Sequence, residues 1–436
     1  MRRKQQIQEG PSYQDTKRSL GRGILICSLA TIFLLYEFIL QVSPSIMTKN
    51  LMVDLGLTFA GLGTTMGFYY YGYTIMQIPG GLLFDRFGPR RLLTLATLTC
   101  ALGALAFASA TGSLLAATSR FFMGIGSAFA FTGALLLIAN WFPPHYFALL
   151  TGIVQLSSCI GAIGGQRPLV PIIQMFGWRN TINTLGLLGV GLAALIWLIV
   201  RDKPYTKSQT TANRPIAFKA ELTRLKHVFK NKQTWWVGLY SFAVWAPMLA
   251  FTALWGIPFL EKAYFLTTQQ ASYSCAIIWL AVGIGSPLLG LWSDTIQKRR
   301  LPLTVSALLG AFSLSALIYW PLSPLAFYMA LLITGLSATG QALAFSLVKE
   351  NNSSAVVGTA MGFNNMAVVA GGALFQPLLG ILLGQASNLN EQFISVQTYQ
   401  QAFVVLPICN LIAAIISHYC IRETYCQSLP DTTSVD

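Results

Sequence analysis

Long runs without any charged side chain alternate with short charged segments along the whole chain. Six such runs cover residues 55–84, 92–119, 180–200, 234–260, 263–293 and 392–421. Each is long enough for a helix that crosses a bilayer, which needs about 20 apolar residues. Three longer charge-free runs, at 121–166, 301–348 and 351–390, leave room for the remaining spans. Because backbone in lipid must satisfy its own hydrogen bonds, the pattern predicts an all-α membrane protein.

The runs predict twelve transmembrane helices in two six-helix pseudo-repeat bundles. The bundles are expected at residues 23–201 and 234–421, with cytoplasmic tails at 1–22 and 422–436 and a basic loop at 202–233. Within that loop, residues 216–229 are predicted either as an amphipathic helix on the inner membrane face or as a solvated charged linker. The expected spans are 23–47, 61–84, 92–110, 114–139, 148–170, 180–200, 235–259, 271–292, 302–320, 325–347, 357–383 and 402–421.

The charge of the chain supports this topology. Only 10% of the 436 residues are charged, whereas soluble domains carry about 25%. A net charge of +14 by itself fits a nucleic-acid partner, but 23 of the 28 Lys and Arg residues fall in segments that are cytoplasmic when the N-terminus is inside. This asymmetry follows the positive-inside rule. We therefore expect a multi-pass protein of the cell (inner) membrane with both termini cytoplasmic, the bilayer as its surroundings, and no nucleic-acid partner.

One charged turn occurs twice. The segment Gly72–Arg91 ends in Asp85-Arg-Phe-Gly-Pro-Arg-Arg91, and a degraded copy follows 209 residues later at Gly290–Arg300. Two copies at this separation indicate a duplicated bundle, an architecture that places a transport site between the halves. The arginines alone fit a charged turn that obeys the positive-inside rule, but the acidic residue at the membrane edge in both copies favours a gate. The residues assigned to this gate are Gly72, Gly80, Gly81, Asp85, Arg86, Gly88, Arg90, Arg91, Asp294, Arg299 and Arg300.

Two expectations follow for the gate. Gly80 and Gly81 should let the second span pack closely on a neighbouring helix, as small residues do in membranes. Asp85 should cap a partner helix or pair with Arg90 or Arg91. Since the second copy is degraded, the first-half loop is expected to matter more for transport than the second.

The pattern from Gly72 to Arg91 closely resembles the loop between the second and third helices of major facilitator superfamily transporters. Arg120-Phe-Phe-Met-Gly-Ile-Gly126 is similar to a second motif of that superfamily. Residues 36–47 and 422–426 resemble a proteobacterial nutrient-uptake branch, which is similar to importers of intracellular bacteria and, more distantly, to lysosomal dipeptide transporters. The resemblance implies a transporter, not an enzyme, that works by alternating access.

Three charged side chains are predicted to lie within spans: Glu37, Arg120 and Arg167. An ionisable group at membrane depth is costly, so it indicates function by default. Glu37 and Arg120 can lie within reach of each other, which fits either a proton-coupling pair or a permanent ion pair that fixes helix packing. Arg167 is expected to extend to the outer interface, with a substrate contact as the alternative.

Uncharged polar and aromatic residues mark the other side of the expected site. The second half carries no charge within its spans, and amides in mid-span are costly unless they face partners or a cavity. Such a site suits a small zwitterion or carboxylate. The candidate substrate-binding residues are Tyr36, Tyr70, Arg120, Gln166, Trp245, Gln341, Asn364 and Asn365.

The leading hypothesis is therefore proton-coupled uptake of a small polar nutrient, such as an amino acid, short peptide or organic acid. A drug or metabolite efflux antiporter is an alternative, although Gln166 stands where the export motif of helix 5 has a proline after Gly152, Gly161 and Gly165. A siderophore or metal-chelate carrier and a membrane nutrient sensor are further alternatives. We expect no cofactor beyond the proton gradient, no metal site, a small-molecule substrate as the partner, and a monomer.

Overall fold

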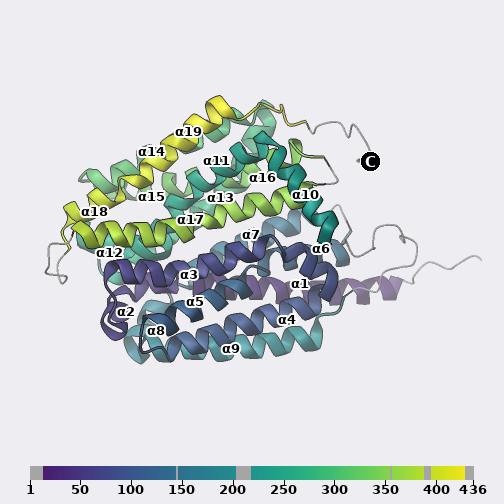
Figure 1. Cartoon of the computed structure of the whole chain (residues 1–436), viewed down its shortest axis with the longest axis horizontal. Coiled ribbons are helices and arrows are strands. Elements are labelled where there is room, and N and C mark those ends of the chain that lie inside the picture. Colours follow the sequence, from purple (N-terminus) through teal and green to yellow (C-terminus); the bar gives the residue numbers. More distant parts are fainter. Residues whose placement is uncertain (1–12, 144–145, 203–217, 354–355, 387–393, 428–436) are drawn as a thin grey trace, which may run out of the picture.

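A computed structural model of the chain describes residues 13–143, 146–202, 218–353, 356–386 and 394–427. Its regular structure over these ranges is entirely helical, and the helices form two bundles that lie side by side (Figure 1). The first bundle contains α1 (Tyr13–Val42), η1 (Ser43–Ile46), α2 (Thr48–Leu55), α3 (Phe59–Gln77), α4 (Gly80–Ala108), α5 (Ser113–Ser127), α6 (Ala130–Trp141), α7 (Phe147–Gly164), α8 (Leu169–Phe176) and α9 (Trp178–Ile199).

The second bundle follows the connecting helix α10 (Phe218–Lys230). It contains α11 (Lys232–Ala250), η4 (Phe251–Trp255), α12 (Gly256–Ala263), α13 (Thr268–Ile296), α14 (Arg300–Tyr319), α15 (Pro324–Ala338), α16 (Gly340–Glu350), α17 (Val357–Ala386), α18 (Val396–Phe403), α19 (Val405–Ile415) and η5 (Ile416–Cys420). Several of these elements run on into one another as single spans, such as α11 through α12. Helix α10 confirms the predicted helix in the loop, while its position on the membrane surface stays a prediction.

The predicted number of spans is confirmed. Eleven helical segments of the described chain are long and apolar enough to cross a membrane, and the bent pair α2–α3 brings the number to twelve. The second span, expected as one helix over 61–84, is broken instead. Helix α3 ends at Gln77, and the chain passes through Ile78 and Pro79 before α4 begins. A proline lacks the backbone N–H that an uninterrupted helix requires at this point.

Gly88 sets the boundary between the second and third spans. Its φ of 73° lies in the left-handed region, which glycine adopts without the steric cost that a Cβ brings. Pro89 follows it, and proline suits the first turn of a helix because its fixed φ is already helical. The direction of α4 therefore changes within the charged turn that the sequence repeats.

Glycines bring two helices of the first bundle into close contact. Gly72 of α3 lies against the backbone of Phe121, and Gly124 of α5 lies against the backbone of Tyr69. A side chain at either position would collide with the facing helix. The two contacts hold α3 and α5 together, and they place Arg120, one turn before Gly124, beside Tyr69.

The prediction of close packing at Gly80 and Gly81 is wrong. The nearest neighbouring atom to a Cβ at Gly80 would be in the Phe129 ring, 3.9 Å away, and nothing lies within 4 Å of one at Gly81. Close helix contacts occur earlier in the same span, where Gly63 and Gly67 meet α17. The two predicted glycines follow the break at Pro79, so they are not carried on the part of the span that packs against α17.

We call the end of the molecule at which α1 starts and η5 ends the basic end, and the opposite end the far end (Figure 1). Two contacts join the bundles at the far end. The Lys49 ammonium lies 2.7 Å from a carboxylate oxygen of Glu261. Deeper inside, the Gln166 side chain donates to the backbone carbonyl of Thr252 at 2.6 Å. Both contacts join the first bundle to the second, so the bundles are closed against each other at the far end.

Candidate functional site

Tyr69 of α3 stands between the two charged residues that the sequence singles out. Its hydroxyl donates a hydrogen bond of 2.6 Å to the Glu37 carboxylate, and its ring face lies 4.6 Å from the guanidinium carbon of Arg120. Glu37 and Arg120 are each only 1% exposed. No oxygen of Glu37 lies within 4 Å of the Arg120 nitrogens, so the two do not form the direct pair that the sequence suggests. Tyr69 is in contact with both of them.

Arg120 is a buried cation without a carboxylate partner among the described residues. Its terminal nitrogens donate to the backbone carbonyls of Leu40 at 2.9 Å and Gln41 at 3.4 Å, while Nε has no hydrogen-bond partner. Two carbonyls and one ring face offset only part of the cost of burying a guanidinium. Arg120 therefore carries a positive charge that its described neighbours balance only in part.

Further polar atoms without partners surround Arg120. The Tyr70 hydroxyl, Gln41 Oε1 and Gln376 Oε1 are all buried and lack a hydrogen bond. Tyr70 interacts electrostatically with Arg120, and its hydroxyl lies near the side chains of Gln41 and Gln376 without the geometry of a hydrogen bond to either. Gln41 and Tyr70 belong to the first bundle and Gln376 belongs to the second, so the cluster lies where the bundles meet. Buried polar groups are nearly always satisfied, and such a gathering of exceptions indicates a place for a ligand or water.

Aromatic rings from both bundles cover another side of the interface. Trp279 of α13 makes edge-on contacts with Phe38 of α1 at 5.9 Å and with Trp245 of α11 at 6.1 Å between ring centroids. The indole N–H of Trp279 is buried without an acceptor. Trp245, predicted as a substrate residue, thus lies beside the interface, with Trp279 nearer to the first bundle.

The remaining candidates fall in different places. Asn364 accepts a hydrogen bond of 2.8 Å from Ser241 inside the second bundle, with its amide nitrogen unpartnered. Asn365 donates to Gln77 of α3 at 2.8 Å and so joins the two bundles. Gln341 is half-buried on α16.

Tyr36 and Gln166 make contacts in other places, and their role in substrate binding stays a prediction. The Tyr36 hydroxyl lies against Gly189 of α9, so it points into the first bundle and away from the interface. Consecutive helix positions differ by about 100°, and Glu37 occupies the direction that faces Tyr69. Gln166 donates to Ser45 as well as to Thr252, which makes it part of the far-end contact between the bundles.

Three residues of the cluster, Gln41, Tyr69 and Gln376, are absent from the residues predicted from the sequence. Tyr69 is one of three consecutive tyrosines, of which Tyr70 was favoured; the third, Tyr71, is 39% exposed. Gln41 follows Glu37 by four residues, and positions i and i+4 share a helix face. That spacing is a signal that could have identified Gln41.

The sequence model of the Major Facilitator Superfamily matches residues 25–376 and 249–425 of the chain. The chain belongs to this superfamily. A probable sulfoacetate transporter of Cupriavidus necator is 25% identical over 286 residues, which are 63% of this chain and 66% of that protein. A probable galactarate/D-glucarate transporter of Bacillus subtilis is 24% identical over 415 residues, 86% of each chain. A crystal structure of a D-xylose-proton symporter superposes with a TM-score of 0.73 at 16% identity, covering 94% of this chain and 100% of that one.

In this superfamily member the first-half charged turn is bound to its own bundle. The Arg90 guanidinium donates twice to the backbone carbonyl of Trp197, at 2.8 and 2.9 Å, and stacks 4.3 Å from the Trp197 ring. The backbone N–H of Arg90 donates to Asp202 at 3.0 Å. A cation is stabilised at the C-terminus of α9 by the helix dipole. Arg90 therefore does not form an ion pair with Asp85, which was one of the two pairings expected for that carboxylate. Asp85, Arg86 and Arg91 are exposed.

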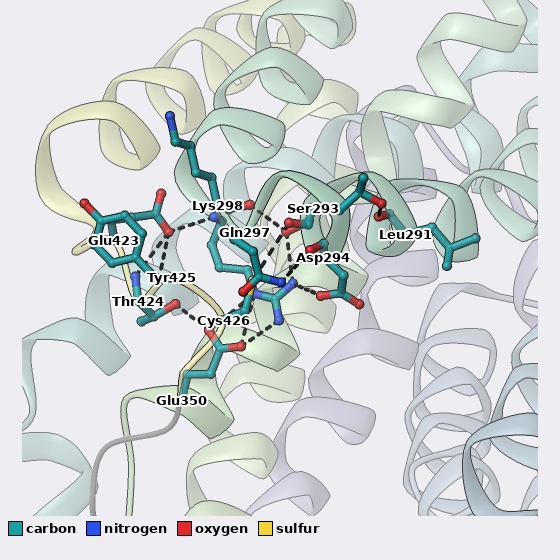
Figure 2. Close-up of polar contacts among 12 residues, drawn as sticks. Leu291, Ser293, Asp294, Gln297, Lys298, Glu350, Glu423, Thr424, Tyr425 and Cys426 are labelled. Atoms are coloured by element: carbon teal, nitrogen blue, oxygen red, sulfur yellow. Dashed lines mark hydrogen bonds and ion pairs between the residues drawn. The ribbon is translucent and has the colours of Figure 1, made fainter.

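The second-half turn holds a denser set of charges (Figure 2). Arg299 pairs with Glu350 at 2.7 Å and with Asp294 at 2.7 Å, and it also donates to Ser293 at 2.9 Å. Burial on its own would lower the pKa of Arg299, but its hydrogen bonds to Glu350 and Asp294 raise the pKa, so the side chain stays charged. The second copy, which matches the motif at fewer positions, thus makes an extensive charge network of its own; the expectation that the first copy matters more for transport stays a prediction.

A carboxylate beyond the last span completes this network. The two oxygens of Glu423 accept hydrogen bonds from the backbone N–H groups of Arg299 at 2.7 Å and Arg300 at 3.0 Å (Figure 2). It caps the first turn of α14, as a negative group does at a helix N-terminus. Thr424 adds a bond to Glu350. Asp202, just beyond the last span of the first bundle, similarly accepts a hydrogen bond from the backbone N–H of Arg90.

Replacing Arg299 by glutamine should destabilise the second bundle by about 3 kcal/mol, because Glu350 then stays buried without its cation. Glu350 is 5% exposed. Thermal unfolding of the purified protein in detergent measures the effect. Lys298→Gln is the matched control, since Lys298 is exposed beside the same turn. The double variant Arg299→Gln/Glu350→Gln should be less destabilised than Arg299→Gln alone. Equal unfolding temperatures for Arg299→Gln and Lys298→Gln would contradict the prediction.

Proposed function

We propose that this protein takes up a small organic anion together with protons. The observation that carries the proposal is the Arg120 guanidinium, which is 1% exposed and pairs with no carboxylate in the described chain. An anionic group of a substrate supplies the missing countercharge. The planar guanidinium suits a carboxylate because it can donate two parallel hydrogen bonds.

The surrounding groups suit the rest of a hydroxylated or amidated small molecule. Gln41, Tyr70 and Gln376 offer hydrogen-bonding atoms that are buried and make no hydrogen bond in this conformation. These residues come from both bundles. Alternating access requires such a site, because both bundles contact the substrate and move relative to each other around it. Sulfoacetate, galactarate and D-glucarate, the compounds named for two relatives, are all carboxylates. The site residues and the names of these relatives together favour organic anions within the broader predicted class of small polar nutrients.

Proton coupling rests on the chain of contacts from Glu37 through Tyr69 to Arg120. A substrate anion and the charged Glu37 carboxylate repel each other, and this repulsion is costly at short range in a low-dielectric interior. A substrate anion at Arg120 neutralises the cation that favours the charged form of Glu37, so a proton enters with the anion. Tyr69 links the two events, because one hydroxyl serves Glu37 and one ring faces Arg120.

Alternating access supplies the transport step. The far-end contacts Lys49–Glu261 and Gln166–Thr252 must break for the site to open there. The charge distribution supports a position of the far end outside the cell, and we propose a multi-pass protein of the cell (inner) membrane with cytoplasmic termini. It acts as a monomer and needs no cofactor other than the proton gradient.

Uptake by purified protein in lipid vesicles tests the proposal. Labelled sulfoacetate and D-glucarate are compared with labelled amino acids and dipeptides, each with and without an imposed inward proton gradient. The proposal expects saturable accumulation of an organic anion that depends on the gradient. Uptake confined to dipeptides or neutral amino acids would contradict the anion site, and gradient-independent accumulation would contradict the coupling.

A further inference from the structure

A groove runs along the lipid-facing side of the second bundle between α13 and α15. It has a volume of about 540 Å³ and is lined almost entirely by apolar side chains, from Tyr273 to Ile284 on α13 and from Tyr328 to Leu336 on α15. Both helices run from the far end towards the basic end, so the two tyrosines mark the same depth at the far end of the groove. Lipid-facing side chains in this groove are well exposed, with Leu280 at 48% and Leu332 at 40%.

A polar pocket of about 390 Å³ continues the groove at its far end. Tyr273 and Tyr328 line both spaces, and Arg167, Thr267 and Gln270 line the polar one. The Arg167 guanidinium lies 5.0 Å from the Tyr273 ring centroid. Within the described chain it pairs with no carboxylate, so its charge is available to a ligand.

The dimensions match one leaflet of a bilayer. From Tyr273 to Ile284 the helix rises about 16 Å at 1.5 Å per residue. The hydrocarbon core of a bilayer is about 30 Å thick, so the groove has the depth of a single leaflet. A cation and two tyrosines at the far end occupy the level at which headgroups lie.

We propose that this groove binds an anionic phospholipid of the far-end leaflet, with an acyl chain between α13 and α15 and the headgroup phosphate at Arg167. An acyl chain matches the apolar length, and a phosphate matches an unpaired arginine surrounded by hydrogen-bonding side chains. The predicted extension of Arg167 to the membrane interface agrees with this position. The site is independent of the substrate cluster around Arg120.

The site also depends on the conformation of the protein. Arg167 belongs to the turn between α7 and α8 in the first bundle, whereas the groove belongs to the second. Opening of the far end separates the two bundles and so divides the headgroup pocket from the chain groove. A bound lipid therefore stabilises the conformation in which the far end is closed.

Lipid retention tests the site directly. Full-length protein is delipidated, returned to phosphatidylglycerol or phosphatidylcholine, and examined by native mass spectrometry. The wild type should retain phosphatidylglycerol in preference to phosphatidylcholine. Arg167→Gln should reduce that preference about fivefold, the effect of one basic residue near a membrane surface. Lys262→Gln, which removes another charge at the far end, should leave the preference unchanged.

A second pair of variants tests the groove, so that the outcome does not depend on the arginine alone. Leu332→Trp fills the groove and should reduce retention of either lipid, whereas Leu325→Trp, at a 74% exposed position earlier on α15, should not. Unchanged phosphatidylglycerol retention in both Arg167→Gln and Leu332→Trp would overturn the proposal.

Cross-linking reports the conformational consequence. The variant Lys49→Cys/Glu261→Cys, made in a background without native cysteines, can be joined by a short bifunctional thiol reagent when the far end is closed, because the two side chains meet there. Phosphatidylglycerol should raise the cross-linked fraction in this background and have no such effect once Arg167→Gln is added. A cross-linked fraction independent of lipid in both proteins would overturn the stabilising role.

Discussion

Uptake of the organic anion should fall at least about 100-fold when Arg120 is replaced by glutamine. The change removes the buried positive charge and leaves an amide among groups that were already short of partners. A charge-assisted hydrogen bond contributes roughly 1.5–3 kcal/mol, and two of them account for a loss of this size. Arg120→Lys should recover little, because an ammonium cannot reproduce the planar pair of donors.

Binding and turnover can be separated in this experiment. The substrate should raise the unfolding temperature of the wild-type protein and should not raise that of Arg120→Gln. Arg179→Lys is a suitable control, because Arg179 also donates to backbone carbonyls, those of Ala108 and Ala110, but lies outside the cluster. Saturable uptake with an unchanged KM in Arg120→Gln would show that the anion binds elsewhere.

Glutamine at Glu37 should abolish gradient-driven accumulation and leave exchange between equal pools intact. The neutral amide has the shape of the protonated carboxyl group, so the substrate-bound protein can still change conformation. It cannot release a proton, so the gradient no longer drives net movement. Counterflow of labelled substrate in vesicles measures exchange, and uptake under an imposed pH gradient measures accumulation.

Tyr69→Phe is the informative companion to Glu37→Gln. It keeps the ring that faces Arg120 but removes the hydroxyl that donates to Glu37. We expect it to bind substrate normally and to accumulate it weakly. Normal accumulation in Glu37→Gln would make Glu37 a packing residue, with the coupled proton carried by another group.

The sequence was sufficient to predict the membrane spans because the pattern that marks each span is local. Charge-free runs of membrane length need no tertiary information, and the left-handed turn is marked by a glycine followed by a proline at Gly88 and Pro89. The depth of Glu37 and Arg120 also follows from counting residues along a helix. What lies between them does not, because the rotation of α3 relative to α1 and α5 is set by packing at Gly72 and Gly124.

The charge network at the second turn was unpredictable for a related reason. Glu350 and Glu423 lie 51 and 124 residues from Arg299. Neither belongs to the repeated motif, so a count of matching motif residues says nothing about them. The motif copy with fewer matches gained partners from elsewhere in its bundle. Gly80 and Gly81 show the converse, since they match the motif and yet make no close contact in this conformation.

The carboxylates beyond each bundle have a bearing on how the chain folds as it is synthesised. Asp202 accepts a hydrogen bond from the backbone of Arg90, so every residue of this contact has been synthesised once the chain reaches residue 202. The second bundle waits for Glu423, which lies 123 residues after the first residue of α14, before α14 receives its cap. Domains generally fold as units, with the N-terminal one first. The first bundle can therefore settle in the membrane while the second is still emerging from the ribosome, and the second is completed only when Glu423 reaches α14.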